Sequence, residues 1–250
     1  MRTVLAWLAA ALLLSASVDA AVFRSPNVKH LSTKTFKKAV HGSDKLTVAA
    51  FVAPWCGYCK KLAPDYDKVA DSLRGLVNVV AVDCDADTNK PLCGEMGIQG
   101  FPTLKLFPGG KAPARNYEGP REARDIITAA TASMPTFVKR AATASEVDAL
   151  REKAKTKPVS LLFTSASKVT PLYKALSTDF YRKMDFYAAR DSKVGQDALA
   201  SFGVDKVPAL IVLQGEEMHK YDGPLKYDKI RSFLEPFATG SNTKTSHEEL

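Results

Sequence analysis

The stretch LTVAAFVAPWCGYC, residues 46–59, decides the fold class of this chain. Its first eight residues are almost continuously apolar, which is typical of a strand buried on both faces of a sheet. From Trp55 to Leu73 the apolar residues have helical spacing, and Pro64 predicts a kink there because it lacks a backbone N–H. A second apolar run, 78–83, predicts a second buried strand. Strand, helix and strand in this order indicate an α/β domain.

The segments around these two strands complete one α/β unit. It includes a hairpin at the Pro108-Gly109-Gly110 turn, so we expect a mixed sheet. The expected strands are 27–32, 46–53, 78–83, 103–107 and 115–118, and the expected helices are 35–40, 55–73, 90–97 and 122–132.

After Met134-Pro135 the same order of elements returns. We expect Ser145 to be the N-cap of the first helix in this second unit. The expected strands are 136–139, 159–164, 183–188 and 209–213, and 218–221 leads to a turn at 222–224. The expected helices are 145–154, 171–181, 196–202 and 227–237.

Two pairs of similar short segments support the repeat. MGIQGFPTL (96–104) aligns with FGVDKVPAL (202–210), and each segment places a proline directly before an apolar strand. YEGP (117–120) aligns with YDGP (221–224). We therefore predict two related α/β domains, 22–133 and 134–238, each with a central mixed sheet flanked by helices.

The two ends of the chain resemble targeting signals. Residues 1–20 combine a charged start, a short apolar run and small residues up to Ala20, as in a cleaved secretory signal peptide. The alternative is a membrane anchor, but the apolar run spans only about half of a bilayer core. The polar tail 239–250 ends in His247-Glu248-Glu249-Leu250, which resembles the tetrapeptides read by the endoplasmic reticulum (ER) retrieval receptor. We expect the mature chain in the ER lumen, without a membrane span.

The composition favours a folded protein that binds no nucleic acid. Hydrophobic residues make up 46% of the chain and charged residues 25%, which is enough apolar material for packed cores. The net charge is +8, but Lys and Arg are dispersed among Asp and Glu, which indicates a solvated basic surface. No nucleotide-binding loop or metal-ligand set is present in the sequence, so we expect no cofactor and no metal.

Cys56 and Cys59 are separated by two residues at the start of the predicted helix. The helix N-terminus favours negative charge, which predicts a Cys56 thiol more acidic than that of a free cysteine. Cys59 lies about one turn further on, where it can attack a mixed disulfide on Cys56 and release the substrate. We expect Trp55 to shield and position this pair.

Two other interpretations of the pair compete with thiol–disulfide exchange. The four cysteines, the pair together with Cys84 and Cys93, could form a zinc site, but eight residues separate the second pair, unlike a usual zinc knuckle. The pair could also be an inert structural disulfide. All four cysteines lie in the first domain, so the second cannot perform thiol chemistry.

FVAPWCGYCK (51–60), followed by Leu62-Ala63-Pro64, resembles the active-site segment of the protein disulfide isomerase family. GFPT (100–103) is similar to the loop that carries the cis-proline of that family. The resemblance covers nearly the whole mature chain, and it is greatest for small members with a single active site. It implies two tandem thioredoxin-like domains, the first catalytic and the second redox-inactive and substrate-binding.

Carried over by position, the resemblance assigns roles to individual residues. Cys56 matches the attacking cysteine, Cys59 the resolving cysteine and Pro102 the cis-proline. Arg121 matches a mobile arginine that tunes the resolving cysteine, although it could equally be a surface residue at a helix N-terminus. The active-site neighbours are Trp55, Gly57, Tyr58, Lys60, Pro102 and Arg121, and the substrate-contacting loop is Phe101, Pro102 and Thr103.

Two positions depart from the family pattern. Tyr58 stands where the family usually has His, and Ala50 stands where it usually has a buried Glu that relays protons for the second cysteine. A neutral Tyr stabilises a thiolate less than a histidinium does. We therefore predict a site less oxidising than the isomerase value of about −180 mV, tending toward the roughly −270 mV of thioredoxin.

Cys84 and Cys93 flank a short loop, and the sequence leaves them two roles. A structural disulfide is favoured, and an auxiliary redox pair is the alternative. For the whole chain, the leading hypothesis is an enzyme that forms, reduces or rearranges disulfides in unfolded or partly folded secretory proteins. An ER thiol oxidase or glutathione would recharge it. The alternative is a chaperone or adaptor whose second domain holds unfolded chains and whose thiols are secondary.

Overall fold

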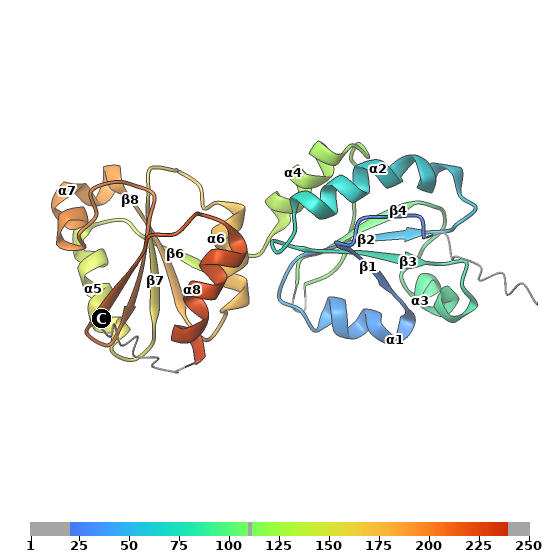
Figure 1. The fold of residues 1–250 in the computed structure, drawn as a ribbon. Helices are drawn as coiled ribbons and strands as arrows, with labels where there is room; N and C mark the ends of the chain where they lie inside the picture. Colours follow the sequence, from blue (N-terminus) through green and yellow to red (C-terminus); the bar gives the residue numbers. More distant parts are fainter. Residues whose placement is uncertain (1–20, 110–111, 240–250) are drawn as a thin grey trace, which may run out of the picture.

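The computed structural model describes residues 21–109 and 112–239, and the predicted signal peptide and retrieval tetrapeptide lie outside them. The described chain forms two α/β domains that lie side by side (Figure 1). The first sheet has the order β1-β3-β2-β4-β5, and the second has the order β6-β8-β7-β9-β10. In both, the first three strands of this order are parallel and the last two are antiparallel to their neighbours. The predicted repeat of a mixed sheet is confirmed.

The first domain follows the predicted element order closely. Its strands are β1 (Val28–Leu31), β2 (Thr47–Val52), β3 (Asn78–Asp83), β4 (Thr103–Phe107) and β5 (Arg115–Asn116). Its helices are α1 (Thr33–Phe36), α2 (Gly57–Ser72), α3 (Lys90–Glu95) and α4 (Ala123–Ser133), with a π-helical turn at Lys37–His41 and a 3-10 turn at Asp87–Asn89.

The second domain repeats this order. Its strands are β6 (Val138–Ala141), β7 (Val159–Thr164), β8 (Asp185–Arg190), β9 (Ala209–Gln214) and β10 (Glu217–Tyr221). Its helices are α5 (Ala144–Ala154), α6 (Pro171–Asp179), α7 (Asp191–Ser201) and α8 (Tyr227–Thr239).

Several expected boundaries were wrong, and three of them have a clear structural cause. The N-cap of α5 is Thr143, whose hydroxyl accepts the Glu146 N–H, and Ser145 lies inside the helix. The strand predicted at 183–188 begins two residues later, because the N–H groups of Lys183 and Met184 are used in a turn that closes on the Phe180 carbonyl. The helix predicted from 196 is preceded by a helical turn at 191–194, and Gly195 separates the two with a φ of 82°.

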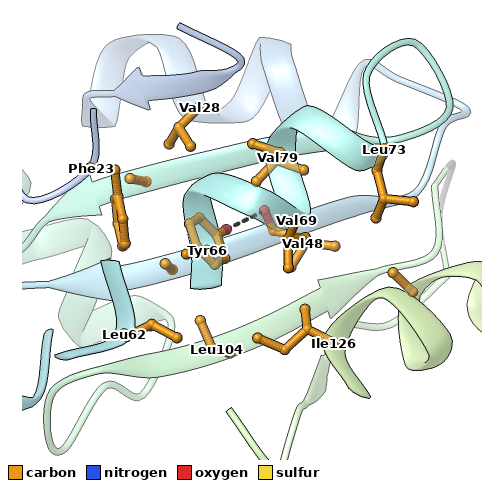
Figure 2. Packing of buried hydrophobic residues seen from close by; sticks show 14 of the residues in the cluster. Phe23, Val28, Val48, Leu62, Tyr66, Val69, Leu73, Val79, Leu104 and Ile126 are labelled. Carbon is orange, nitrogen blue, oxygen red and sulfur yellow. Dashed lines mark hydrogen bonds between the residues drawn. The ribbon is translucent and has the colours of Figure 1, made fainter. Parts of the chain in front are cut away.

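A buried tyrosine in each domain, from α2 in the first and from α6 in the second, joins two neighbouring strands. Tyr66 of α2 is fully buried, and its hydroxyl lies 2.9 Å from the Val48 carbonyl (Figure 2). The same hydroxyl lies 2.8 Å from the Val80 carbonyl. Tyr173 of α6 makes the same bridge, with both the Ser160 and Tyr187 carbonyls at 3.0 Å. Burial raises the pKa of both phenols far above the usual value, so they remain neutral donors. The repeat therefore extends to the hydrogen bonds of the two cores.

The two domains meet through a partly buried charged cluster. Lys45 of the first domain lies 2.8 Å from the Asp179 carboxylate and 2.8 Å from the Tyr227 hydroxyl of the second. It also donates to the Gly75 carbonyl at 2.7 Å, and the Tyr227 hydroxyl donates to Asp179. Any side chain at Gly75 would collide with the Tyr227 ring. Specific contacts, in addition to the linker, thus hold the domains together.

No helix in the described ranges 21–109 and 112–239 is long and apolar enough to cross a bilayer.

Candidate active site

The first cysteine of the pair lies where β2 leads into α2. Cys56 is the N-cap residue of α2, and its sulfur accepts a hydrogen bond from the Cys59 N–H at 3.1 Å. The unpaired N–H groups of a helix N-terminus point at an N-cap side chain and favour negative charge on it. Both cysteines are free thiols in this structure. The predicted arrangement at the helix start is therefore present.

The two thiols differ in exposure. Cys56 is 6% exposed, whereas Cys59 is completely buried one turn further along α2. Burial, reinforced by the hydrogen bond with Cys56, raises the pKa of Cys59 to about 12, and the positive charge of Arg121 partly opposes this. At neutral pH Cys59 is therefore a protonated thiol behind the more accessible Cys56 sulfur.

The loop before β4 and the start of α4 meet at this site. The Phe101–Pro102 peptide bond is cis. Arg121 donates from Nη2 to the Pro102 carbonyl at 3.0 Å, and Thr103 donates from Oγ1 to the Gly100 carbonyl at 2.7 Å. The structure thus brings the residues matched by the resemblance to one place. It also gives Arg121 a partner that its position at a helix start did not suggest.

Two large aromatic side chains beside the cysteines are exposed. Trp55 is 65% exposed and Tyr58 is 67% exposed. The Trp55 ring lies edge-on to Phe101, with centroids 6.0 Å apart, and the ammonium of Lys61 lies 5.5 Å from the Tyr58 ring centroid. Lys61 was not among the predicted site residues, although its position three residues after Tyr58 on a helix is a usable signal. The site therefore presents an apolar surface around the thiols.

A small apolar residue, Ala50, occupies the position at which a buried Glu would relay protons for the second cysteine. Ala50 is fully buried in β2, between Ala81 of β3 and Leu104 of β4. No carboxylate can act from this position, so protons leaving Cys59 need another acceptor.

Cys84 and Cys93 form a disulfide, with an S–S distance of 1.97 Å and a Cα–Cα distance of 5.9 Å. Cysteines bonded to each other cannot ligate zinc together with Cys56 and Cys59. In addition, no cluster of potential metal ligands occurs among the residues that the structure describes.

Replacing both Cys84 and Cys93 with alanine is expected to lower the free energy of unfolding by about 2–3 kcal/mol, because the unfolded chain loses a closed loop. Turnover of a small disulfide substrate should stay unchanged, since Cys56 and Cys59 remain in place. Chemical denaturation and a turnover assay on the same preparations measure both. Lost turnover with unchanged stability would instead assign the pair to redox exchange.

Comparison with known proteins matches both halves of the chain. Residues 27–132 match the thioredoxin family, and residues 134–242 match the family described as the A6-like middle domain. A Dictyostelium discoideum protein described as a protein disulfide-isomerase is 39% identical over 224 residues, which are 86% of this chain and 53% of the relative. The chain belongs to the protein disulfide isomerase family.

Other relatives in the protein disulfide isomerase family show the same partial coverage. The Saccharomyces cerevisiae protein disulfide-isomerase MPD1 is 33% identical, over 68% of this chain and 58% of the relative. A Medicago sativa protein described as a protein disulfide-isomerase A6 is 31% identical, over 72% of this chain and 53% of the relative. The chain therefore spans little more than half the length of these relatives.

A crystal structure of ERdj5 shares the fold over 86% of this chain and 30% of that one. The TM-score is 0.53 and the sequence identity is 18%.

The resolving step is expected to accelerate with pH, because attack by Cys59 requires its thiolate and its pKa is about 12. The rate of mixed-disulfide release should rise about tenfold per pH unit between roughly pH 7 and 9. Replacing Arg121 with Gln removes the charge that lowers this pKa, so release should become slower at every pH in that range. Stopped-flow single-turnover measurements test both; equal release rates for wild type and R121Q would contradict a role for Arg121.

Proposed function

We propose that this chain is a thiol–disulfide oxidoreductase and isomerase that acts on disulfides of folding secretory proteins through Cys56 and Cys59. The observation that carries the proposal is the placement of the two thiols. The Cys56 sulfur lies at the N-terminus of α2 and accepts the Cys59 N–H, and the buried Cys59 thiol lies behind it. The cis Pro102 loop and Arg121 lie at the same site.

Reduction of a client disulfide proceeds in two exchanges. The Cys56 thiolate attacks one client sulfur and forms a mixed disulfide, and the other client sulfur leaves as a thiolate and takes up a proton. Cys59 then loses its proton and attacks the Cys56 sulfur. This forms the Cys56–Cys59 disulfide and releases the second client thiol. Oxidation of a client runs the same steps backward, and isomerisation uses the first exchange and its reversal.

The residues around the thiols receive roles in this proposal. Trp55 and Tyr58 provide exposed apolar surface for a client chain. Gly57 opens α2, and Lys60 adds positive charge on the same helical turn. The loop of Phe101, Pro102 and Thr103 contacts the extended client segment.

The proposed compartment is the ER lumen. Support comes from the signal-like segment 1–20, the terminal tetrapeptide His247-Glu248-Glu249-Leu250 and the relatives described as protein disulfide-isomerases. In that compartment an ER thiol oxidase or oxidised glutathione would reoxidise the Cys56–Cys59 pair, and the retrieval receptor would bind the tetrapeptide.

We propose that the thioredoxin-like domain at 22–133 is catalytic and that the one at 134–238 is redox-inactive and binds clients. The second contains no cysteine. Refolding of a reduced, disulfide-containing protein tests the enzymatic function: wild type should accelerate it, and C56S/C59S should not. If C56S/C59S accelerates refolding as well as wild type does, the enzymatic proposal fails and the chaperone alternative stands.

Replacing Tyr58 with His is expected to make the site more oxidising by tens of millivolts, because a histidinium beside the Cys56 thiolate stabilises the reduced form. Titration in glutathione buffers measures the reduction potential of wild type and Y58H. A wild-type potential at or above about −180 mV would contradict the predicted reducing poise.

A further inference from the structure

The second domain contains a pocket at the carboxyl ends of its parallel strands β6, β7 and β8. The pocket has a volume of about 360 Å³, within the range of roughly 300–1,000 Å³ typical of ligand sites. Its apolar lining includes Ala141, Leu162, Val169 and Ala188. The segment 166–170, which leads into α6, closes one side, as 53–56 leads into α2 in the first domain.

The charged residues that line this pocket are all cationic. They are Arg140, Lys168, Arg190 and Lys193, and no acidic residue lines it. None of the four forms an ion pair within the described residues. The Nε atom of Arg190 is buried and has no hydrogen-bond partner among those residues. A buried donor without an acceptor is costly, so the pocket is suited to a ligand that supplies a negatively charged acceptor.

The first domain has a pocket at the equivalent place with a different charge. Strand register pairs Thr164 with Arg190 in the second domain and Val52 with Asp83 in the first. Thus Asp83 lines the first pocket where Arg190 lines the second. Residues 21 and 22 line the first pocket as well, and the adjacent Phe23 packs on Tyr66 at a centroid distance of 4.6 Å. A cationic lining without ion pairs is therefore a property of the second domain and not of the shared fold.

We propose that this pocket binds an extended client segment whose pocket-facing side chains include both carboxylates and aliphatic groups. The carboxylates would pair with Arg190 and Lys193, and an aliphatic side chain would lie against Leu162 and Ala188. The proposed client-binding role of the second domain is the premise on which this inference rests. The pocket proposal specifies the clients as protein segments that contain both acidic and aliphatic residues.

The test uses the chain from residue 21 to residue 250 and short fluorescein-labelled peptides, with fluorescence anisotropy as the readout. A peptide with the repeat Asp-Asp-Leu-Leu, which presents both side-chain types on each face of an extended chain, should bind. R190Q/K193Q should weaken its binding about tenfold through the loss of two charge contacts. The matched control K155Q/K220Q removes the same charge outside the pocket and should bind like wild type. The same repeat with lysine in place of aspartate, or with serine in place of leucine, should bind more weakly.

Three results would overturn the pocket proposal. The first is equal binding by R190Q/K193Q and wild type, and the second is equal binding of the lysine–leucine peptide. The third is binding only after deletion of 240–250, which would mean that the acidic C-terminal segment of this chain is the occupant. C56S/C59S should bind the peptide like wild type. Refolding that C56S/C59S accelerates as well as wild type does, together with retained peptide binding, would therefore mark failure of the redox proposal alone.

Discussion

Replacing Cys56 with serine is expected to reduce disulfide turnover to the uncatalysed rate, because a serine hydroxyl at the N-cap of α2 is not a thiolate nucleophile. Replacing Cys59 with serine should stop the reaction one step later. The Cys56 sulfur can still attack, but no second thiol releases the client. C59S should therefore accumulate a mixed disulfide with client, whereas C56S should accumulate none.

Non-reducing electrophoresis with intact-mass analysis distinguishes the two variants. The matched control is C84A/C93A, which removes the other cysteine pair and should behave like wild type. If C56S accumulated the mixed disulfide and C59S did not, the assigned order of attack would be reversed.

Replacing Tyr66 with alanine is expected to destabilise the first domain by about 3–5 kcal/mol, because it removes a fully buried ring and the hydroxyl that joins β2 and β3. This loss is a large fraction of the stability of a typical domain, which is about 5–15 kcal/mol. Since α2 carries both active-site cysteines, redox turnover should fall with the folded fraction. Chemical denaturation followed by circular dichroism, with turnover measured alongside, checks the effect.

The duplicated fold supplies the control for this prediction. Tyr173→Ala removes the same bridge, between β7 and β8, from the second domain. It should lower stability similarly but spare turnover of a small disulfide substrate, which needs only the first domain. If Y173A and Y66A reduced that turnover equally, the domains would fold as one unit through the Lys45–Asp179 contact, which would contradict the expected independence of the first domain.

Most of the fold was predictable from local pattern. The apolar run before Cys56 and the run at 78–83 are short-range signals, and the structure places strands at both. The repeat was marked by the prolines before β4 and β9 and by the segments YEGP (117–120) and YDGP (221–224). In the structure both prolines are cis, and Tyr117 and Tyr221 each donate to the carbonyl of the proline three residues on. Errors occurred at element ends, where single backbone hydrogen bonds decide the boundary.

The arrangement of site residues that lie close together in the sequence was predicted. Contacts between site residues far apart in the sequence were not predicted. The spacing of Cys56 and Cys59 on one helical turn predicts thiol exchange by itself. Burial of Cys59, however, depends on how α2 packs on the sheet. The contact of Arg121 with the Pro102 carbonyl joins residues 19 positions apart, and Lys45 with Tyr227 joins residues 182 positions apart. Neither pairing has a local pattern from which it could be inferred.

The sequence alone therefore determined the α/β class, the doubling of the domain and the thiol pair at a helix start, because periodicity and spacing encode these locally. Only the tertiary structure decided which thiol is buried and which residues join the domains. It also decided that Arg140, Lys168, Arg190 and Lys193 surround one apolar pocket. In the sequence those cations were part of a dispersed basic charge. They come together because β6, β7 and β8 end at one edge of the sheet, and the segments that follow these strands meet there.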